Sequence, residues 1–538
     1  MNRAAAPTTL TALTATFDAE KAALQAVIDR LERRVTELEE QLRLERAQRF
    51  APRSEKVKDR IFNEAEQEAA EDADDEASQD DDAAALPVVP DTGRPTSEKP
   101  VPAKRGRKPL PADLPRRRVE HDLPEDEKVC PCCSAALHRM GETVTEQLHV
   151  EINATVVQNV RFKYACRACE RTGIRTPVVM APMPPQPLPG SVATPSTLAL
   201  VLASKYVDGL PLYRLSAALK RAHVDLSRGT LGHWVVRSSE RHLERVYDVL
   251  KERLRSQPLV HGDETRVQVL KEEGRSAQSQ SFMWGYRSAA DSPQPIVLLD
   301  YQPGRGQVHP QAFLGDYRGL LMSDGYDAWR TLEGATHLGC MAHARRKFTD
   351  ALKARKKSGG PPRQALEFFA ALYDVERLAG QAPPDGMSRA EYILQLRQQH
   401  SVPVLTAFRT WLDEMAPKIL PTSLTGEAIA YTRNQWDYLV RYASDPRAPI
   451  DNNVIERDIK NFVIGRKAWL FSDTPQGARA SAVIYSLALT CRACGVDPYD
   501  WLVHVLTELP RRDPDADIED LLPYNFVANN AKQAENTS

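Results

Sequence analysis

The first regular pattern along the chain is an apolar repeat near the N-terminus, with spacings that alternate between four and three residues. Its members are Leu24, Ile28, Leu31, Val35, Leu38 and Leu42. Ile and Val at one core position with Leu at the other favour parallel two-stranded coiled coils. We therefore expect a leucine-zipper-like coiled coil over residues 15–50 that makes the protein a homo-oligomer. A helix packed on its own chain is the alternative.

The apolar positions further along separate helical from strand-forming segments. Residues 190–255 and about 350–440 have helical spacing, without strand candidates in the second range. Three runs between polar turns, LVHGDETRVQVL, SFMWGYRS and PIVLLDYQ, predict an antiparallel meander. A helical stretch at His309–Leu314 precedes a short apolar strand, Leu320–Met322. The later motifs THLGCMAHARRKF and DNNVIERDIKNFVIGRKAWLF predict a strand running into a helix and then a further helix.

This order of elements predicts the fold class. Three strands, a further strand and then helices is the order of a ribonuclease-H-like core, which we place at residues 256–475. A chain of 538 residues is too long for one domain. We expect a multidomain α+β protein with a C-terminal helical segment at 476–515 and a tail at 516–538.

A candidate DNA-binding hairpin lies within residues 190–255. The segment LYRLSAALKRAHVDLSRGTLGHWVVRSS predicts a helix, a short turn and a second helix, with Ser227 or Thr230 as the cap of the second. Helix-turn-helix modules have this pattern, and so do ordinary helical hairpins.

Charge is distributed in opposing blocks that the net charge of −2 conceals. Residues 64–82 hold eleven acids and no base, so an acidic, disordered linker is expected over 57–103. Residues 104–120 form a basic arm, in which Arg105, Arg107 and Lys108 are candidates for contacting DNA phosphates or a minor groove. A solvated linker is the alternative. With no signal peptide and no membrane-spanning run, we expect a cytoplasmic protein, and the DNA-binding candidates add association with the nucleoid.

Paired cysteines predict a zinc site in residues 121–185. Cys130 and Cys133, followed by Cys166 and Cys169, give two CxxC knuckles separated by 32 residues. Two such knuckles complete a tetrahedral sulfur cage for structural Zn²⁺. The intervening LHVEINATVVQNVRFKYAC alternates as a hairpin does, which favours a zinc ribbon. Cys132 is an extra thiol in this region.

Three acids occupy the positions at which a ribonuclease-H-like core gathers carboxylates. Asp263 lies in the first strand, Asp324 just after the fourth, and Glu456 on the later helix. Clustered carboxylates repel one another unless cations neutralise them, and oxygen ligands select Mg²⁺ or Mn²⁺. Two such ions would support phosphodiester cleavage. Strand alternation turns only one of Asp263 and Glu264 into the site.

Each acid also has an ordinary interpretation as a turn or salt-bridge residue. The competing acids are Glu264, Asp300, Asp316, Asp327 and Asp451.

The chain resembles transposases of the insertion-sequence-66 family, a branch of the DDE transposases, from about Leu24 to Leu509. The similar segments, in the order of the family, are RFAPRSEK, GRKPLPADLPR, the two CxxC motifs, SKYVDGLPLYR, HGDETRV, SDGYDAW, CMAHARRKF, ERDIKNFVIGRKAWLF and PQGARASAVIYSLALTCRACGVDPYDWLVHVL. The chain departs from the family in having Lys460-Asn461 where Arg-Pro is more common, and CPCCS where CPxCG is more common.

The resemblance implies DNA cleavage and strand transfer at the terminal inverted repeats of a mobile element. It assigns Asp263, Asp324 and Glu456 as metal-binding acids and the 350–440 helices as an insertion between the last two. It also implies work beside two small accessory proteins of the same element. The residues expected to contact DNA phosphates are His343, Arg345, Arg346, Lys347, Lys460, Arg466 and Lys467. The C-terminal pair Cys491 and Cys494 is expected to pack on a helix.

Two other classes of function compete with this interpretation. In one, the zinc ribbon and helix-turn-helix form a non-catalytic DNA-binding regulator, and the acids are structural. In the other, the heptads assemble a scaffolding protein, which would show no salt-sensitive DNA binding.

Overall fold

A five-stranded sheet forms the centre of the computed structural model, which describes residues 7–50, 114–122, 124, 128, 139, 143–148, 153–167, 171, 178–355 and 359–526. Its strands, in spatial order, are β5 (Val297–Gln302), β4 (Gln280–Ser288), β3 (Leu259–Gln268), β6 (Leu320–Ser323) and β7 (Thr336–Gly339). β3, β4 and β5 pair antiparallel, and β6 and β7 run parallel to β3. The predicted meander and the short fourth strand are confirmed.

The outer edge of β5 is closed by α17 (Pro475–Ala493). The Ser486 hydroxyl accepts a hydrogen bond from the Leu299 amide at 2.7 Å, and the Thr490 hydroxyl accepts one from the Val297 amide at 3.0 Å. An edge strand otherwise presents unpaired amides to solvent. These two hydroxyls therefore end the sheet on this side and fix α17 against it.

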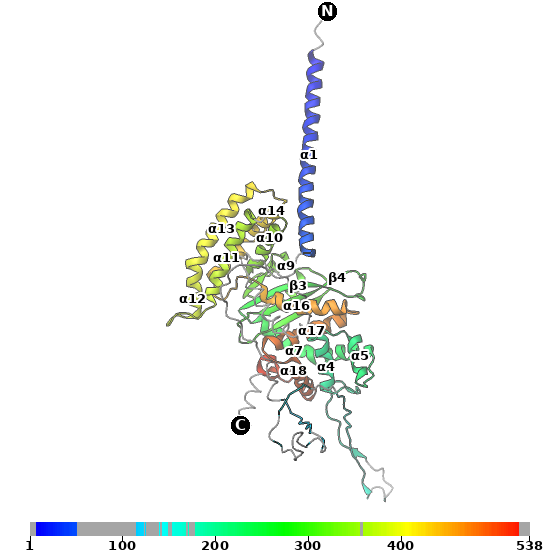
Figure 1. The fold of residues 1–538 in the computed structure, drawn as a ribbon. Helices are drawn as coiled ribbons and strands as arrows, with labels where there is room; N and C mark the ends of the chain where they lie inside the picture. Colours follow the sequence, from blue (N-terminus) through cyan, green and yellow to red (C-terminus); the bar gives the residue numbers. More distant parts are fainter. Residues whose placement is uncertain are drawn as a thin grey trace, which may run out of the picture.

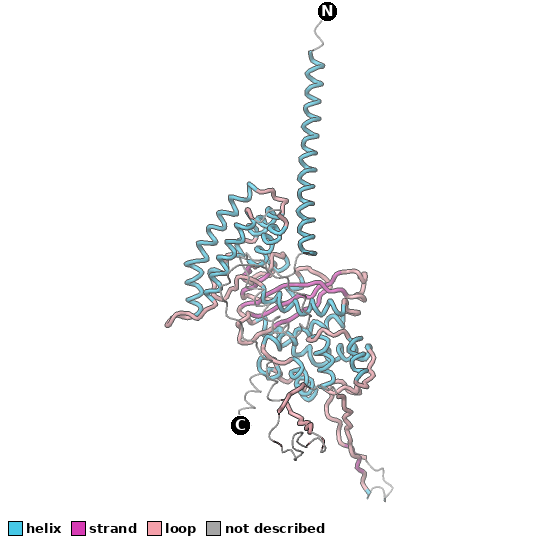
Figure 2. Tube along the Cα trace, viewed as in Figure 1, coloured by secondary structure: helices cyan, strands magenta, loops and turns pink. Residues whose placement is uncertain are grey.

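Helices lie on both sides of the sheet (Figures 1 and 2). One group consists of α4 (Pro195–Tyr206), α5 (Leu212–Arg221), α6 (Arg228–Ser238), the π-helix Ser239–Leu243, α7 (Glu244–Arg255) and α18 (Pro498–Glu508). The predicted helical hairpin is α5 and α6, and Ser227 caps α6 by accepting a hydrogen bond from the Thr230 amide at 3.0 Å. Two short helices, α8 (Val308–Leu314) and α9 (Asp327–Arg330), flank β6.

The predicted helical stretch at about 350–440 is confirmed, and it shares a second hydrophobic cluster with Leu259, Leu320, Met322 and Leu338 of the sheet. Its elements are α10 (Met341–Lys353), α11 (Pro361–Ala379), α12 (Arg389–Leu396), the π-helix Arg397–Ser401, α13 (Val402–Met415), α14 (Leu424–Asn434) and α15 (Trp436–Leu439). α16 (Asn453–Trp469) follows, and 3₁₀ turns lie at Ala416–Lys418, Arg441–Ser444, Leu509–Arg511 and Glu519–Leu521. Phe348, Phe369 and Phe408 pack at the centre of this second hydrophobic cluster.

The heptad segment is one continuous helix, α1 (Pro7–Phe50), which projects from the rest of the chain (Figure 1). Its seam residues are 46–64% exposed, so this chain does not cover them. The end of α1 contacts the helical stretch, where Arg43 donates to the Ala354 carbonyl at 2.8 Å and Glu40 accepts from the Leu424 amide at 3.3 Å. The helix is confirmed, and its pairing with a second copy stays a prediction.

The expected hairpin between the two CxxC motifs is not found in the described residues. Of residues 148 and 153–166, only β1 (Lys163–Tyr164) is a strand, and it pairs antiparallel with β2 (Val179–Met180). Val156, Val160 and Phe162 are 67–89% exposed. Apolar alternation stabilises a hairpin only where one face is covered, and this face is bare.

Several predicted segments lie outside the described residues. They include Cys130, Cys133 and Cys169, the arm residues Arg105, Arg107 and Lys108, and the acidic linker; Cys166 is described and exposed. Among the described helices, none is both long and apolar enough to cross a membrane.

The helical stretch depends on a buried ion pair that yields a test. Arg397 is 3% exposed, donates to both carboxylate oxygens of Glu376 at 2.9 and 2.7 Å, and donates to the Tyr442 carbonyl at 2.7 Å. Arg397→Ala leaves the Glu376 carboxylate without its ion-pair partner and should lower the free energy of local unfolding by about 3–5 kcal/mol. Arg409→Ala, in an exposed pair with Asp413, should cost less than about 1 kcal/mol. Hydrogen exchange of the α13 amides measures both, and equal protection in the two variants would contradict this assignment.

Candidate functional site

Asp263 of β3 and Asp324, just after β6, occupy matching positions on two neighbouring strands. The parallel ladder between these strands runs from Leu259↔Leu320 to His261↔Met322. Continued two residues beyond the ladder, this register places Asp263 level with Asp324, although the carboxylate oxygens of Asp263, Asp324 and Glu456 do not all lie within 4.8 Å of one another. β6 ends at Ser323, so Asp324 begins the loop that follows. Its carboxylate accepts a hydrogen bond from the Tyr326 amide at 2.9 Å, which orders that turn.

The third acid is positioned by a buried amide, Asn452, immediately before α16. Its Nδ2 donates to the Gly262 carbonyl at 2.9 Å, and its Oδ1 accepts from His261 Nδ1 at 2.8 Å. Its backbone amide donates to Cys340 Sγ at 3.2 Å. Asn452 therefore joins the start of α16 to β3 and to the end of β7. Glu456, in the first turn of α16, is thereby brought near Asp263 in the middle of β3.

Two glycines allow the close approaches on either face of this strand. Gly285 pairs with Asp263 across the β3–β4 ladder, and a Cβ there would lie 2.9 Å from Ile459 of α16. A Cβ on Gly262 would lie 2.5 Å from Trp329. Asp263 therefore shares the α16 face of the sheet, and its neighbour Glu264 shares the Trp329 face.

Electrostatics identify Asp263 as the centre of an acidic cluster. Burial raises the pKa of the Asp263 carboxyl well above its ordinary value, and the charges of Glu264, Glu456 and Asp324 raise it further. Among the main influences on the pKa of Asp263, only the hydrogen bond from the Glu264 backbone amide lowers it. A carboxylate surrounded by carboxylates has the electrostatics of a divalent-cation site.

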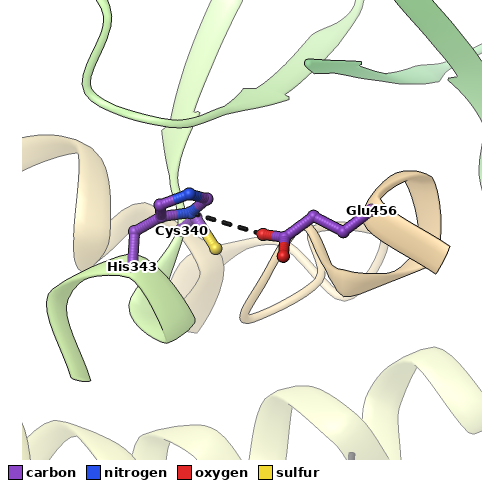
Figure 3. Close-up of side chains that lie close together, drawn as sticks. All are labelled: Cys340, His343 and Glu456. Carbon is purple, nitrogen blue, oxygen red and sulfur yellow. Dashed lines mark ion pairs between the residues drawn. The ribbon is translucent and has the colours of Figure 1, made fainter. Parts of the chain in front are cut away.

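The Glu456 carboxylate lies between two of the predicted DNA-contacting residues. Arg346 Nη2 pairs with Glu456 Oε2 at 2.9 Å, and His343 Nδ1 lies 3.6 Å from Glu456 Oε1. Figure 3 shows the His343 and Glu456 side chains pointing toward each other, with Cys340 beside them. Burial lowers the pKa of His343, which favours its neutral form. Both residues thus lie in the acidic site itself.

The competing acids have other partners or face solvent. Glu264 accepts from Arg305 Nε at 2.7 Å and from Trp329 Nε1 at 2.9 Å. Asp451 accepts from the Tyr373 hydroxyl at 2.7 Å. The remaining competitors are Asp300, which accepts from Gln302, and the exposed Asp316 and Asp327.

The other predicted basic residues lie on surfaces around the site. Arg466 donates to the Thr265 hydroxyl at 3.2 Å, and burial lowers its pKa. It helps to line a polar pocket of about 310 Å³, whose walls are Glu264, Thr265, Arg266, Phe282, Arg305 and Arg466. Lys460 and Lys467 are exposed along α16, Arg345 is half-buried on α10, and Lys347 Nζ lies 4.7 Å from the Tyr431 ring centre.

Sequence reasoning missed Asn452, Arg305 and Cys340. The paired asparagines of DNN before the helix are a signal for the first, because Asn is common where helices begin. Arg305 lies 41 residues from the acid that it pairs with. Cys340 lies in an apolar strand end, and only its contact with Asn452 reveals it.

Comparison with protein families gives matches along most of the chain. A family model described as "Transposase IS66 family" matches residues 190–480, and "IS66 C-terminal element" matches 486–524. "Zinc-finger binding domain of transposase IS66" matches residues 127–170, and "Transposase C of IS166 homeodomain" matches 37–119.

Three similar proteins come from Sinorhizobium fredii (strain NBRC 101917 / NGR234), and each is described as uncharacterized. y4jD is 34% identical over 431 residues, covering 76% of this chain and 80% of the relative. y4qI is 32% identical over 419 residues, covering 75% of this chain and 74% of the relative. y4hP is 29% identical over 425 residues, also covering 75% and 74%.

The acidic cluster predicts an unusual dependence of stability on pH. The pKa of Asp263 is higher in the folded state than in the unfolded state. The contribution of Asp263 to folding stability is therefore fully present below its unfolded pKa near 4, and it is lost as pH rises through the folded pKa. Asp263→Asn should therefore raise the Tm of the protein in Mg²⁺-free buffer at pH 8, by about 1–2 °C per kcal/mol of repulsion removed, as expected for a unit of several hundred residues. At pH 4 it should change the Tm little.

The exposed Asp327 provides the control. Asp327→Asn should leave the Tm unchanged at both pH values in scanning calorimetry. A lower Tm for Asp263→Asn at pH 8 would show that its charge is already compensated within the protein.

Proposed function

The chain belongs to the IS66 transposase family, and we propose that it cuts and joins DNA with a site built from Asp263, Asp324 and Glu456. The observation that carries this proposal is that the Glu456 and Asp324 carboxylates lie close enough to a partly buried Asp263 to help raise its pKa. They come from a central strand, the end of its parallel neighbour and a later helix. The strand order β5-β4-β3-β6-β7 supports a ribonuclease-H-like core, with α11–α15 as its insertion.

The residues present fit a pair of hard divalent ions. All three proposed ligands are carboxylates, and oxygen donors favour Mg²⁺ or Mn²⁺. No basic group is among the main influences on the Asp263 carboxyl. Ions bound there would supply the positive charge that a phosphodiester needs when water or a 3′-hydroxyl attacks it.

The chain's own basic residues would hold the DNA strand beside these acids. Arg466 has no acidic partner within the described ranges, and its pocket adjoins Asp263 through Thr265 and Glu264. A phosphate oxygen can take the guanidinium donors that remain. Arg346 is exposed beside Glu456 and can exchange that carboxylate for a phosphate as DNA enters. Lys460 and Lys467 extend the same basic surface along α16.

The remaining segments would recognise the ends of the element. The zinc-finger family match supports structural Zn²⁺ on Cys130, Cys133, Cys166 and Cys169. The capped hairpin of α5 and α6 offers a second DNA-binding surface, and the exposed seam of α1 offers pairing of two copies. Two copies would bring two terminal inverted repeats together.

Removing a ligand carboxylate should abolish cleavage without abolishing binding. Asp263→Asn and Glu456→Gln should each reduce Mg²⁺-dependent nicking of a duplex carrying an element end by more than about 10²-fold, because the ions lose an anionic ligand. End binding in a gel-shift assay should change little. Asp327→Asn, three residues from Asp324 but exposed, should nick normally. Normal nicking by Asp263→Asn would overturn the proposal, and binding without any metal-dependent nicking in the wild type would favour a regulator.

The Arg466 pocket predicts a salt-dependent effect. Arg466→Ala should weaken DNA binding by a similar factor on all sequences and reduce the slope of log K against log salt by about 1, as expected for one phosphate contact. Arg363→Ala, in an exposed pair with Glu367 on α11, should leave that slope unchanged. An unchanged slope for Arg466→Ala would remove this residue from the DNA surface.

A further inference from the structure

A second set of ligand atoms gathers at the edge of the acidic site, and its chemistry differs from that of the carboxylates. Cys340 Sγ, one His343 ring nitrogen and one Glu456 oxygen all lie within 4.8 Å of one another. Figure 3 shows the three side chains converging from two elements, the start of α10 and the first turn of α16. They combine a sulfur, a nitrogen and an oxygen donor.

The backbone holds these residues together independently of any DNA. Cys340 occupies the N-cap position of α10 and His343 follows three residues later, so both lie on one side of the first turn. The Met341 amide donates to the Ile450 carbonyl at 3.1 Å, and the Asn452 amide donates to Cys340 Sγ at 3.2 Å. These two bonds tie the start of α10 to the segment that leads into α16. The cluster is therefore a fixed feature of the fold.

Two of the candidate ligand atoms are buried without a hydrogen bond. His343 Nδ1 and Glu456 Oε1 have no hydrogen-bond partner within the part of the chain that is described, although they face each other at 3.6 Å. Buried polar atoms are nearly always satisfied, and an unpaired pair commonly marks a place for an ion or a water. The opposite oxygen of Glu456 is already bound to Arg346. Only the inward-facing oxygen is thus available.

The distance between the nitrogen and oxygen donors suits a small tetrahedral ion. Ligands about 2.0–2.1 Å from Zn²⁺ at tetrahedral angles lie roughly 3.3–3.5 Å apart, close to the 3.6 Å between His343 Nδ1 and Glu456 Oε1. A thiolate sulfur stands slightly further from zinc, at about 2.3 Å. The amide that donates to Cys340 Sγ would orient and stabilise that thiolate.

We propose that Cys340, His343 and Glu456 form a binding site for Zn²⁺ or a similar thiophilic divalent ion, separate from the zinc finger. Sulfur and imidazole donors select such an ion over Mg²⁺. Binding releases the Cys340 thiol proton to solvent, and the thiolate and carboxylate then balance the charge of the ion. Three protein ligands leave the fourth position open.

Occupancy of this site controls the acidic cluster, an extension that rests on the proposed function. Glu456 is shared, and an ion on its Oε1 with Arg346 on its Oε2 leaves no oxygen facing Asp263 and Asp324. Zn²⁺ therefore competes with Mg²⁺ for Glu456 and inhibits cleavage. DNA that draws Arg346 away would free one oxygen.

The zinc content of the full-length protein tests the site directly. After saturation with Zn²⁺ and gel filtration, the wild type should retain one ion more per chain than Cys340→Ser, measured by plasma mass spectrometry. His343→Asn, at a partly exposed position, should lose the same ion. This variant tests the site even if Cys340→Ser, at a buried position, fails to fold. Cys494→Ser, at a partly buried thiol outside the cluster, should retain the wild-type content. Equal zinc content in the wild type and a folded His343→Asn overturns the proposal.

Inhibition provides the second readout. Nicking in Mg²⁺, normalised to the zinc-free rate of each protein, should be at least about tenfold more sensitive to added Zn²⁺ in the wild type than in Cys340→Ser. Equal sensitivity overturns the competition for Glu456. If the extra ion is absent while Mg²⁺-dependent nicking persists, this inference fails and the proposed function stands. If the ion is present and nicking is absent, the zinc site stands and the proposed function fails.

Discussion

One buried amide, the side chain of Asn452, determines the geometry on which the candidate site depends. Asn452 is fully buried. Its side chain forms hydrogen bonds with the Gly262 carbonyl and the His261 ring, and its backbone N–H donates to Cys340 Sγ. A buried polar group of this kind is costly to leave unpaired, so its three bonds specify one position for the start of α16. Glu456 follows four residues later. Without that junction, the third acid would have no fixed relation to the other two.

The same region carries several carboxylates, and basic residues of the protein compensate only part of their negative charge. Arg346 pairs with Glu456, and on the opposite face of β3 Arg305 pairs with Glu264, which also accepts a hydrogen bond from Trp329. Asp263 has no such partner among its main influences. Functional sites commonly retain uncompensated charge of this kind, because a ligand supplies the missing partner. The cluster is therefore arranged to gain stability from a cation.

Sequence patterns predicted the regular elements well where burial decides the structure. The β3, β4 and β5 runs, the short β6 strand and the helices α10, α11, α13 and α14 have spacings that match their buried faces. Pattern reasoning failed in LHVEINATVVQNVRFKYAC, where alternation is present but nothing described covers it. The expectation that His343 and Arg346 contact DNA phosphates stays a prediction, and pattern reasoning did not foresee that both lie against Glu456. Contacts between residues more than a hundred positions apart, such as Arg346 with Glu456, depend on the tertiary fold and leave no local signal.

The most direct test of the central claim is the position of Mn²⁺ in crystals of the full-length protein, located by anomalous diffraction. We expect two peaks about 3.5–4 Å apart, each within about 2.5 Å of carboxylate oxygens from Asp263, Asp324 and Glu456. In that state Glu456 should have turned from Arg346 toward Asp263. Manganese bound elsewhere, with these three carboxylates unliganded and Glu456 still paired with Arg346, would contradict the central claim.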